Sequence, residues 1–168
     1  SDGLATGYSW LYNLCPLVAG AIAGAFWQVF VIFGVHWGFV PIMQTELTGQ
    51  GFSYLTAALF PAVLAQAGAA LAVMIRTKNK DLRAVAGPAA VSGFLAGITE
   101  PAIYGVTLRL KKPFIYAAVS GAIGGAIVAI GGGATDVFAL PGLITITATL
   151  NHGFLSVVIG PAVAEVLA

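Results

Sequence analysis

The sequence predicts an all-α membrane protein in which transmembrane helices are accompanied by at least one re-entrant hairpin. Only 8% of the 168 residues are charged, against roughly 25% in an ordinary soluble domain, and the mean hydropathy is +0.97. Several apolar stretches are close to the length of about 20 residues that a helix needs to cross a bilayer. Glycine and proline interrupt these stretches, which membrane proteins tolerate where the freed backbone is buried in protein or lines a cavity.

Four apolar blocks are the expected spans, with an interrupted segment after the first. The spans are Leu14 to Phe33, Phe52 to Ile75, the stretch that follows Pro113, and Leu143 to Leu167. Within the first span, Gly20 and Gly24 lie four residues apart, a spacing that allows close helix packing. The segment "GVHWGFVPIMQTELTGQG" that follows is rich in glycine and predicts a broken helix or loop at or near membrane depth. We see no separate soluble domain, so residues 1–168 are expected to form a single membrane region.

All seven basic residues fall into two clusters, and their positions suggest a re-entrant segment. The clusters are Arg76, Lys78, Lys80 and Arg83, and Arg109, Lys111 and Lys112. Lysine and arginine in short loops collect on the cytoplasmic side of a membrane. If both clusters follow this rule, Ala84 to Leu108 enters and leaves by the same face, with its tip near "GITEP". The alternative is one broken spanning helix with one basic cluster outside.

Glu100 and His36 are the best candidates for a binding site. An ionisable residue inside a membrane segment is costly and often marks a substrate or proton path. A carboxylate accepts hydrogen bonds from sugar hydroxyls, and Trp37 beside His36 could supply an apolar face, so the three residues fit a carbohydrate site. The alternatives are that Glu100 only holds the hairpin and that His36 is an interfacial histidine beside a belt tryptophan. His152, in "TLNHGF", is a further candidate that has an equally good structural explanation.

Other classes of site find little support in the sequence. The net charge of +1 does not favour nucleic acid as a partner, and the bilayer is the first partner expected. There is no phosphate-binding glycine loop, nucleophile elbow or metal-ligand pair of histidines, so we expect no cofactor and no metal. The single Cys15 has no basic neighbour in sequence and reads as a structural thiol.

Two motifs resemble a known family. "GITEPAIYGVTLRLKKPF", Gly97 to Phe114, resembles the signature of the membrane (IIC) component of the bacterial phosphotransferase system (PTS) for sugars, in the glucose superfamily. "GVHWGFVPI", Gly34 to Ile42, looks like the histidine motif of the same family. The "AIYGV" continuation is similar to the β-glucoside, sucrose and trehalose branch, and general likeness favours β-glucosides. The resemblance covers the whole chain, which would be a fragment corresponding to the C-terminal, sugar-binding half of an EIIC domain.

The resemblance implies a sugar transporter that couples uptake to phosphorylation. Glu100 and His36 would bind the sugar hydroxyls, Glu100 would also polarise the 6-hydroxyl that is phosphorylated, and Thr99, Trp37 and His152 are weaker carry-overs. The partners would be the IIB domain with its phosphocysteine and the IIA domain with its phosphohistidine. Cys15 does not match the IIB motif, so the phosphorylated cysteine of this phosphotransferase would not lie on this chain. A homodimer through the earlier helices and a multi-pass location in the bacterial cytoplasmic membrane are further expectations.

Two rival functions stay open from the sequence. In one, Glu100 and His36 form the proton relay of a proton-coupled sugar transporter, since both groups can titrate when their surroundings shift them. In the other, the chain is a non-transporting membrane scaffold or receptor whose small-residue faces serve helix association. Substituting Glu100 should then leave sugar affinity unchanged.

Overall fold

The computed structural model describes residues 2–135, 142–144 and 159, and within these ranges every named element is helical. The elements up to residue 58 are α1 (Asp2–Leu14), α2 (Pro16–Ile32), the 3₁₀-helix η1 (Val35–Phe39), α3 (Val40–Gln50) and α4 (Tyr54–Ala58). The later elements are α5 (Phe60–Arg76), α6 (Lys80–Ala96), α7 (Glu100–Ala102), the π-helix η2 (Ile103–Thr107), α8 (Leu108–Leu110) and α9 (Lys112–Ile130). The all-helical prediction is confirmed for the described residues.

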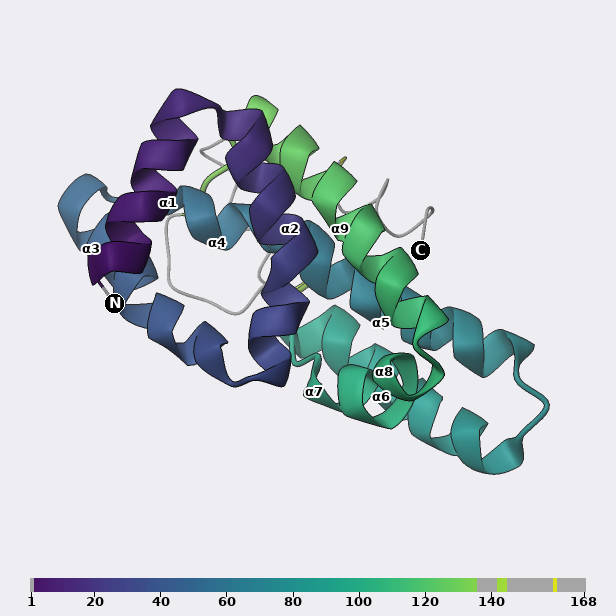
Figure 1. Ribbon diagram of the computed structural model, residues 1–168. Coiled ribbons are helices and arrows are strands. Elements are labelled where there is room, and N and C mark those ends of the chain that lie inside the picture. The colour runs from purple at the N-terminus through teal and green to yellow at the C-terminus, as the bar shows by residue number, and fades with distance from the viewer. Residues whose placement is uncertain (1, 136–141, 145–158, 160–168) are drawn as a thin grey trace.

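The centre of the molecule is formed by α2, α5 and α9, which pack side by side (Figure 1). Helices α2 and α9 run antiparallel and meet at glycines, with Gly20 against Gly125 and Gly24 against Gly121. A Cβ atom on Gly24 would overlap the carbonyl oxygen of Gly121, so no larger residue fits this seam. The backbones therefore approach closely, as the spacing of Gly20 and Gly24 predicted.

Helices α5 and α6 form an antiparallel pair in which small residues again face each other. A Cβ on Gly93 of α6 would overlap the side chain of Ala67 on α5, and Gly87 faces Met74 nearer the connecting turn. Helix α6 ends at Ala96 and is capped by Gly97, whose φ of 72° is left-handed and whose amide donates to the Gly93 carbonyl oxygen. Glycine adopts this conformation without a Cβ penalty, so the chain can turn sharply there.

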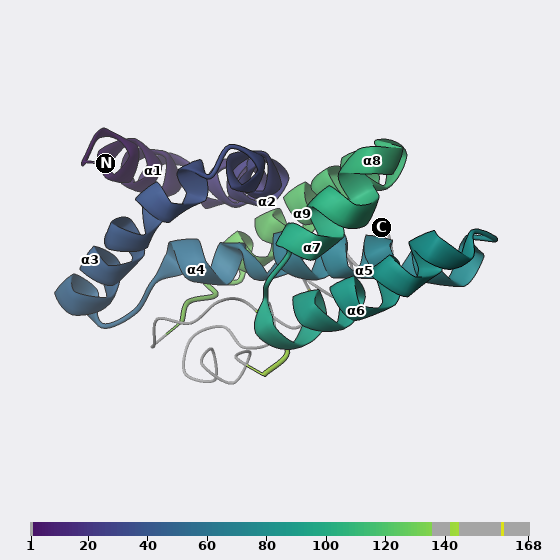
Figure 2. The same cartoon turned by 90° about the horizontal axis from the view of Figure 1, so that it is seen from below.

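After this turn the chain runs back through α7, η2 and α8 toward the end of the molecule where α5 ends and α9 begins (Figure 2). Leu82 near the start of α6 and Leu110 at the end of α8 line one groove together with Arg76 and Lys112. Both basic clusters thus lie at one end of the described structure, which we call the basic end. The "GITEP" segment lies at the turn between α6 and the returning stretch of α7, η2 and α8.

Three of the four expected spans coincide with described helices, and one of these three is shortened. Two helical stretches are long and apolar enough to cross a membrane, Leu55–Arg76 and Lys112–Ile130. Helix α2 is apolar but has 17 residues, because Cys15 and Pro16 separate it from α1 and a turn at Gly34 ends it. At about 1.5 Å per residue, 17 residues reach the lower end of the spanning range. The expected span Leu143 to Leu167 lies almost wholly outside the described residues.

Candidate functional site

The two motifs singled out in the sequence meet in space, because each follows an interruption of a helix. His36 lies in η1, directly after the turn at Gly34 that ends α2. Glu100 is the first residue of α7, with Pro101 next to it at a position where proline starts helices well. From Glu100 the chain stays helical through η2 and α8 to Leu110, and a carboxylate at a helix N-terminus interacts favourably with the helix dipole.

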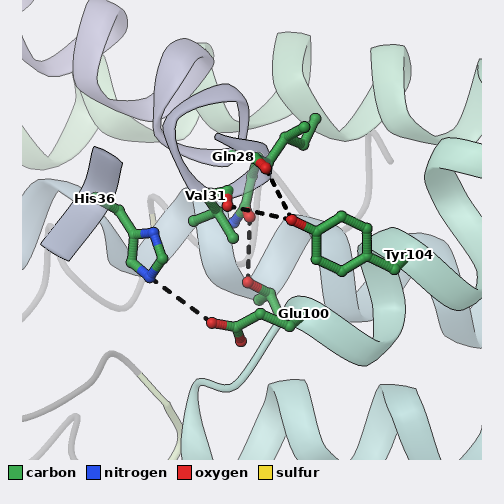
Figure 3. A network of polar contacts seen from close by, with 7 residues as sticks. Gln28, Val31, His36, Glu100 and Tyr104 are labelled. Carbon is green, nitrogen blue, oxygen red and sulfur yellow. Dashed lines mark hydrogen bonds and ion pairs between the residues drawn. The ribbon is translucent and has the colours of Figure 1, made fainter. Parts of the chain in front are cut away.

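His36 and Glu100 point toward each other across a short gap (Figure 3). His36 Nε2 lies 3.7 Å from Glu100 Oε1, which is an ion pair when the imidazole is protonated. The His36 side chain is 13% exposed, whereas that of Glu100 is 42% exposed. The carboxylate therefore keeps free acceptor capacity on the open side of the pair.

Aromatic rings hold the imidazole in place. The rings of Trp27 and His36 pack edge to face, with centroids 5.9 Å apart and an interplanar angle of 77°. Trp37 lies on another side, with its ring centroid 5.4 Å from that of His36. His36 Nδ1 is buried and has no hydrogen-bond partner among the described residues. A buried polar atom without a partner is unfavourable.

A cavity of about 450 Å³ opens beside this pair. Its volume falls within the range of about 300–1,000 Å³ that small-molecule sites occupy. Thr99, Glu100 and His36 contribute the polar atoms at one part of the wall. The rest of the lining is mainly apolar and includes Trp27, Val31, Trp37, Val40, Met43, Leu59 and Val63.

Two side-chain contacts tie the Glu100 segment to the end of α2 (Figure 3). Thr99 Oγ1 donates to Gln28 Oε1 at 3.2 Å, and Gln28 Nε2 donates to the Ala62 carbonyl oxygen on α5 at 3.1 Å. Tyr104 donates its hydroxyl to the Ile32 carbonyl oxygen at 2.9 Å. Glu100 is therefore flanked by a contact one residue before it and another four residues after it, and both lead to the helix that precedes His36.

A third contact ties the same segment to α5. Thr107 Oγ1 donates to Gln66 Oε1 at 2.9 Å, and both side chains are fully buried. Thr107 is the last residue of the π-helix η2. π-Helical turns are rare overall, and many of those known lie at functional sites. The arm from Glu100 to Leu110 is thus fixed to α2 on one side and to α5 on the other.

The predicted site residues have different positions in the structure. Glu100, His36 and Trp37 line one cavity, and Trp37 is 64% exposed. Thr99 lines it as well, but its hydroxyl already donates a hydrogen bond to Gln28. His152 lies outside the described residues. Within residues 2–135, 142–144 and 159, no three His, Cys, Asp or Glu side chains come together as metal ligands would.

Gln28 and Tyr104 take part in this site, and the sequence did not single them out for it. The signal for Gln28 was present, because a lone amide in an apolar helix needs a buried partner. No signal was available for Tyr104, because its acceptor is a backbone carbonyl, which every residue carries.

Interrupted helices around a mainly apolar cavity with a few polar groups at its wall, beside two helices that could span a bilayer, are typical of membrane transporters. Comparison with known families narrows this class to one family. The family model "Phosphotransferase system, EIIC" matches residues 1–121, and the chain belongs to this family. No solved structure matches the chain.

Relatives with curated names agree with the family. The chain is 48% identical over 147 residues to the PTS system beta-glucoside-specific EIIBCA component of Dickeya chrysanthemi, covering 88% of this chain and 23% of the relative. It is 44% identical over 158 residues to the component of the same name from Halalkalibacterium halodurans, covering 89% and 24%. It is 38% identical over 170 residues to the sucrose-specific EIIBC component of Bacillus subtilis, covering 99% and 37%. The chain thus spans about a quarter of the length of the first two relatives.

Proposed function

We propose that this chain is the C-terminal, sugar-binding part of an EIIC domain, within a longer permease that imports a β-glucoside and couples import to its phosphorylation. We call that longer protein the parent permease. The observation that carries the proposal is the pairing of His36 with Glu100 at the wall of a cavity of ligand size, in a chain of the EIIC family. A β-glucoside is favoured over sucrose because the two β-glucoside relatives described above, at 48% and 44% identity, are more similar to this chain than the sucrose-specific relative from Bacillus subtilis at 38%.

The side chains around the cavity suit a sugar. The half-exposed Glu100 carboxylate accepts hydrogen bonds from sugar hydroxyls, and His36 beside it places a second polar side chain at the same wall. Trp37 presents an exposed aromatic face next to His36, against which the apolar face of a sugar ring can pack. Thr99 and, from outside the described residues, His152 would add further contacts.

The phosphoryl transfer needs no nucleophile from this chain. In our proposal the oxygen of the sugar 6-hydroxyl attacks the phosphorus of the IIB phosphocysteine, so that a P–O bond forms and the S–P bond breaks. The thiolate leaves, and the hydroxyl proton passes to Glu100 as general base. In such reactions positioning and charge stabilisation do most of the catalytic work, so the role of the site is to hold one hydroxyl in line.

The partners and location follow from this role. We propose that IIB and IIA domains act with the chain, as the EIIBCA names of the two β-glucoside relatives suggest for those proteins. We further propose a multi-pass location in the bacterial cytoplasmic membrane and a homodimer formed through helices outside this chain. In this arrangement residues 84–108 form a re-entrant hairpin, which is supported by the turn at Gly97 and by the two basic clusters at one end.

The hairpin is tested by labelling. Single cysteines at Lys80 and Lys111, in a Cys15→Ser background of the parent permease, are treated with a membrane-impermeant maleimide from each side. We expect both positions to react only from the cytoplasmic side. Labelling of the two cysteines from opposite sides would rule out the hairpin and favour a single broken span.

The sugar site is tested by binding a radiolabelled β-glucoside to the parent permease in membranes. We expect Glu100→Gln and His36→Ala to lower affinity about tenfold to a hundredfold, because a hydrogen bond to a charged group is worth about 1.5–3 kcal/mol. Asp81→Asn is the control, because Asp81 is exposed at the start of α6 and lines no part of the cavity. Unchanged binding in both site variants would refute the sugar site and support the scaffold alternative.

The coupling mechanism is tested separately from binding. Vesicles that contain the parent permease are supplied either with phosphoenolpyruvate and the soluble PTS proteins or with a proton gradient alone. We expect phosphorylated sugar to appear only in the first case. Accumulation of unmodified sugar on the proton gradient would identify a proton-coupled transporter instead.

A further inference from the structure

A second groove lies at the basic end of the molecule, away from the His36–Glu100 cavity. It has a volume of about 490 Å³ and lies between the end of α5 and the start of α9. Its floor is apolar and includes Ala69, Ala72, Val73 and Pro113. Its polar rim contains Arg76, Thr77, Lys112 and Tyr116, and among the described residues no acidic side chain lines it. The groove therefore combines an apolar trough with a positively charged mouth.

The two cations at the rim are available for a ligand. Arg76 and Lys112 are exposed, and neither forms a hydrogen bond or ion pair with its side chain among the described residues. Arg83 differs, because its guanidinium donates from Nε to the Met74 carbonyl oxygen at 3.1 Å and from Nη2 to that of Thr77 at 2.7 Å. Arg83 thus closes the turn between α5 and α6, whereas Arg76 and Lys112 have no such structural duty.

The depth of the groove indicates what it holds. Arg76 ends one candidate span and Lys112 begins the other, so the rim would lie at the membrane surface. Ala69 lies seven residues before Arg76 on α5, a distance of about 10 Å along the helix. The floor thus lies at the depth of lipid chains, which a soluble domain docked on the surface does not reach.

We infer that this groove binds an anionic phospholipid, with the phosphate between Arg76 and Lys112 and an acyl chain along Ala72 and Val73. Basic residues near the cytoplasmic surface attract anionic lipids, and basic pockets between membrane helices bind their headgroups. Tyr116 lies at the rim, where its amphipathic ring suits the interface. The inference rests on the membrane orientation proposed above, but not on the identity of the sugar.

The test measures lipid retention by the purified parent permease. The delipidated protein is titrated with dioleoyl phosphatidylglycerol or dioleoyl phosphatidylcholine, which share their acyl chains, and bound lipid is counted by native mass spectrometry. Arg76→Gln/Lys112→Gln should weaken phosphatidylglycerol binding about tenfold or more, because both cations that face the phosphate are removed. The control Lys78→Gln/Arg109→Gln removes the same charge at the same end of the molecule from residues that do not line the groove, and should bind as wild type. Equal losses in both double variants, or no loss in either, would refute the site.

Three further readouts separate the lipid from other ligands. Ala72→Phe fills the trough without changing the charge, and it should also lower phosphatidylglycerol retention; normal retention in this variant would refute an acyl-chain site. Inorganic phosphate at millimolar concentration should not displace the lipid, and its displacement would point to a free-phosphate site. Slower phosphoryl transfer from phospho-IIB to Arg76→Gln/Lys112→Gln in lipid-free detergent would identify IIB as the occupant instead.

The β-glucoside affinity of the groove variants distinguishes a loss of the lipid site from a loss of the sugar site. The groove shares no lining residue with the His36–Glu100 cavity, so sugar binding should be normal in all of them. Loss of lipid retention with normal sugar binding is the expected pattern. Loss of both in Arg76→Gln/Lys112→Gln, with the control double variant normal, would show that the groove supports the sugar site and would overturn an independent lipid site.

Discussion

The two halves of α2 are held by different forces. Its first half packs on α9 through Gly20 and Gly24, where backbone meets backbone. Its second half buries Trp27 and Val31 in an apolar cluster that includes Ile103, and it also meets the Glu100 segment through polar contacts, from Thr99 to Gln28 and from the Tyr104 hydroxyl to the Ile32 carbonyl oxygen. One helix thus belongs both to a seam of backbone contacts and to a site where hydrogen bonds add to side-chain packing.

The difference matters because the two kinds of contact respond differently to change. A glycine seam tolerates no added atom, since the neighbouring backbone cannot move away without moving a whole helix. A hydrogen bond between side chains is worth about 0.5–1.5 kcal/mol and can break and re-form without unpacking the core. We therefore expect changes in the seam to affect folding first, and changes at the polar contacts to affect sugar binding first.

The largest effect is expected at the seam. Gly24→Ala places a Cβ onto the Gly121 carbonyl oxygen, and overpacking of this kind costs about 1–3 kcal/mol and occasionally more. We expect a marked fall in the melting temperature of the parent permease in detergent and a smaller folded fraction. Gly49→Ala in α3 is the control, because nothing lies within 4 Å of a Cβ at Gly49. Equal melting temperatures for the two variants would show that the seam can open and that its close packing is not needed for stability.

A loss of stability no larger than that at the seam, joined to a loss of sugar affinity, is expected at Gln28. Gln28→Leu removes two hydrogen bonds and leaves the buried Thr99 hydroxyl without its partner, which costs about 1–3 kcal/mol. Because Thr99 precedes Glu100, β-glucoside affinity should fall as well. The matched control is Gln44→Leu on the exposed side of α3. A lower melting temperature with unchanged affinity would mean that Gln28 serves the scaffold and not the site.

The sequence predicted the scaffold half better than the site half. Apolar length and small-residue spacing are properties of single helices, so the spans and the packing role of Gly20 and Gly24 could be predicted without knowing what lies opposite. The identity of their partners, Gly121 and Gly125, depends on how α2 and α9 cross, which local sequence does not encode.

The site was predicted only where chemistry is conspicuous. His36 and Glu100 could be paired because ionisable residues in apolar sequence must face the protein interior or a polar cavity. The exposure of Glu100 could not be predicted, since it depends on the cavity that η1 and α7 leave between them. The contact from Tyr104 to the Ile32 carbonyl also escaped prediction, because it requires the π-helical turn that sets the direction of the tyrosine.

The smallest effect is expected at Tyr104. Tyr104→Phe removes one hydroxyl from a half-exposed ring, so stability should change little, while the loss of one hydrogen bond should weaken β-glucoside binding about twofold to tenfold. Tyr116→Phe, on α9 and outside the cavity lining, is the control. If Tyr104 acts by positioning Glu100, its effect on affinity should largely disappear in the Glu100→Gln background, because the two residues then share one interaction. Additive losses in the double variant would instead mean that Tyr104 affects binding independently of the carboxylate.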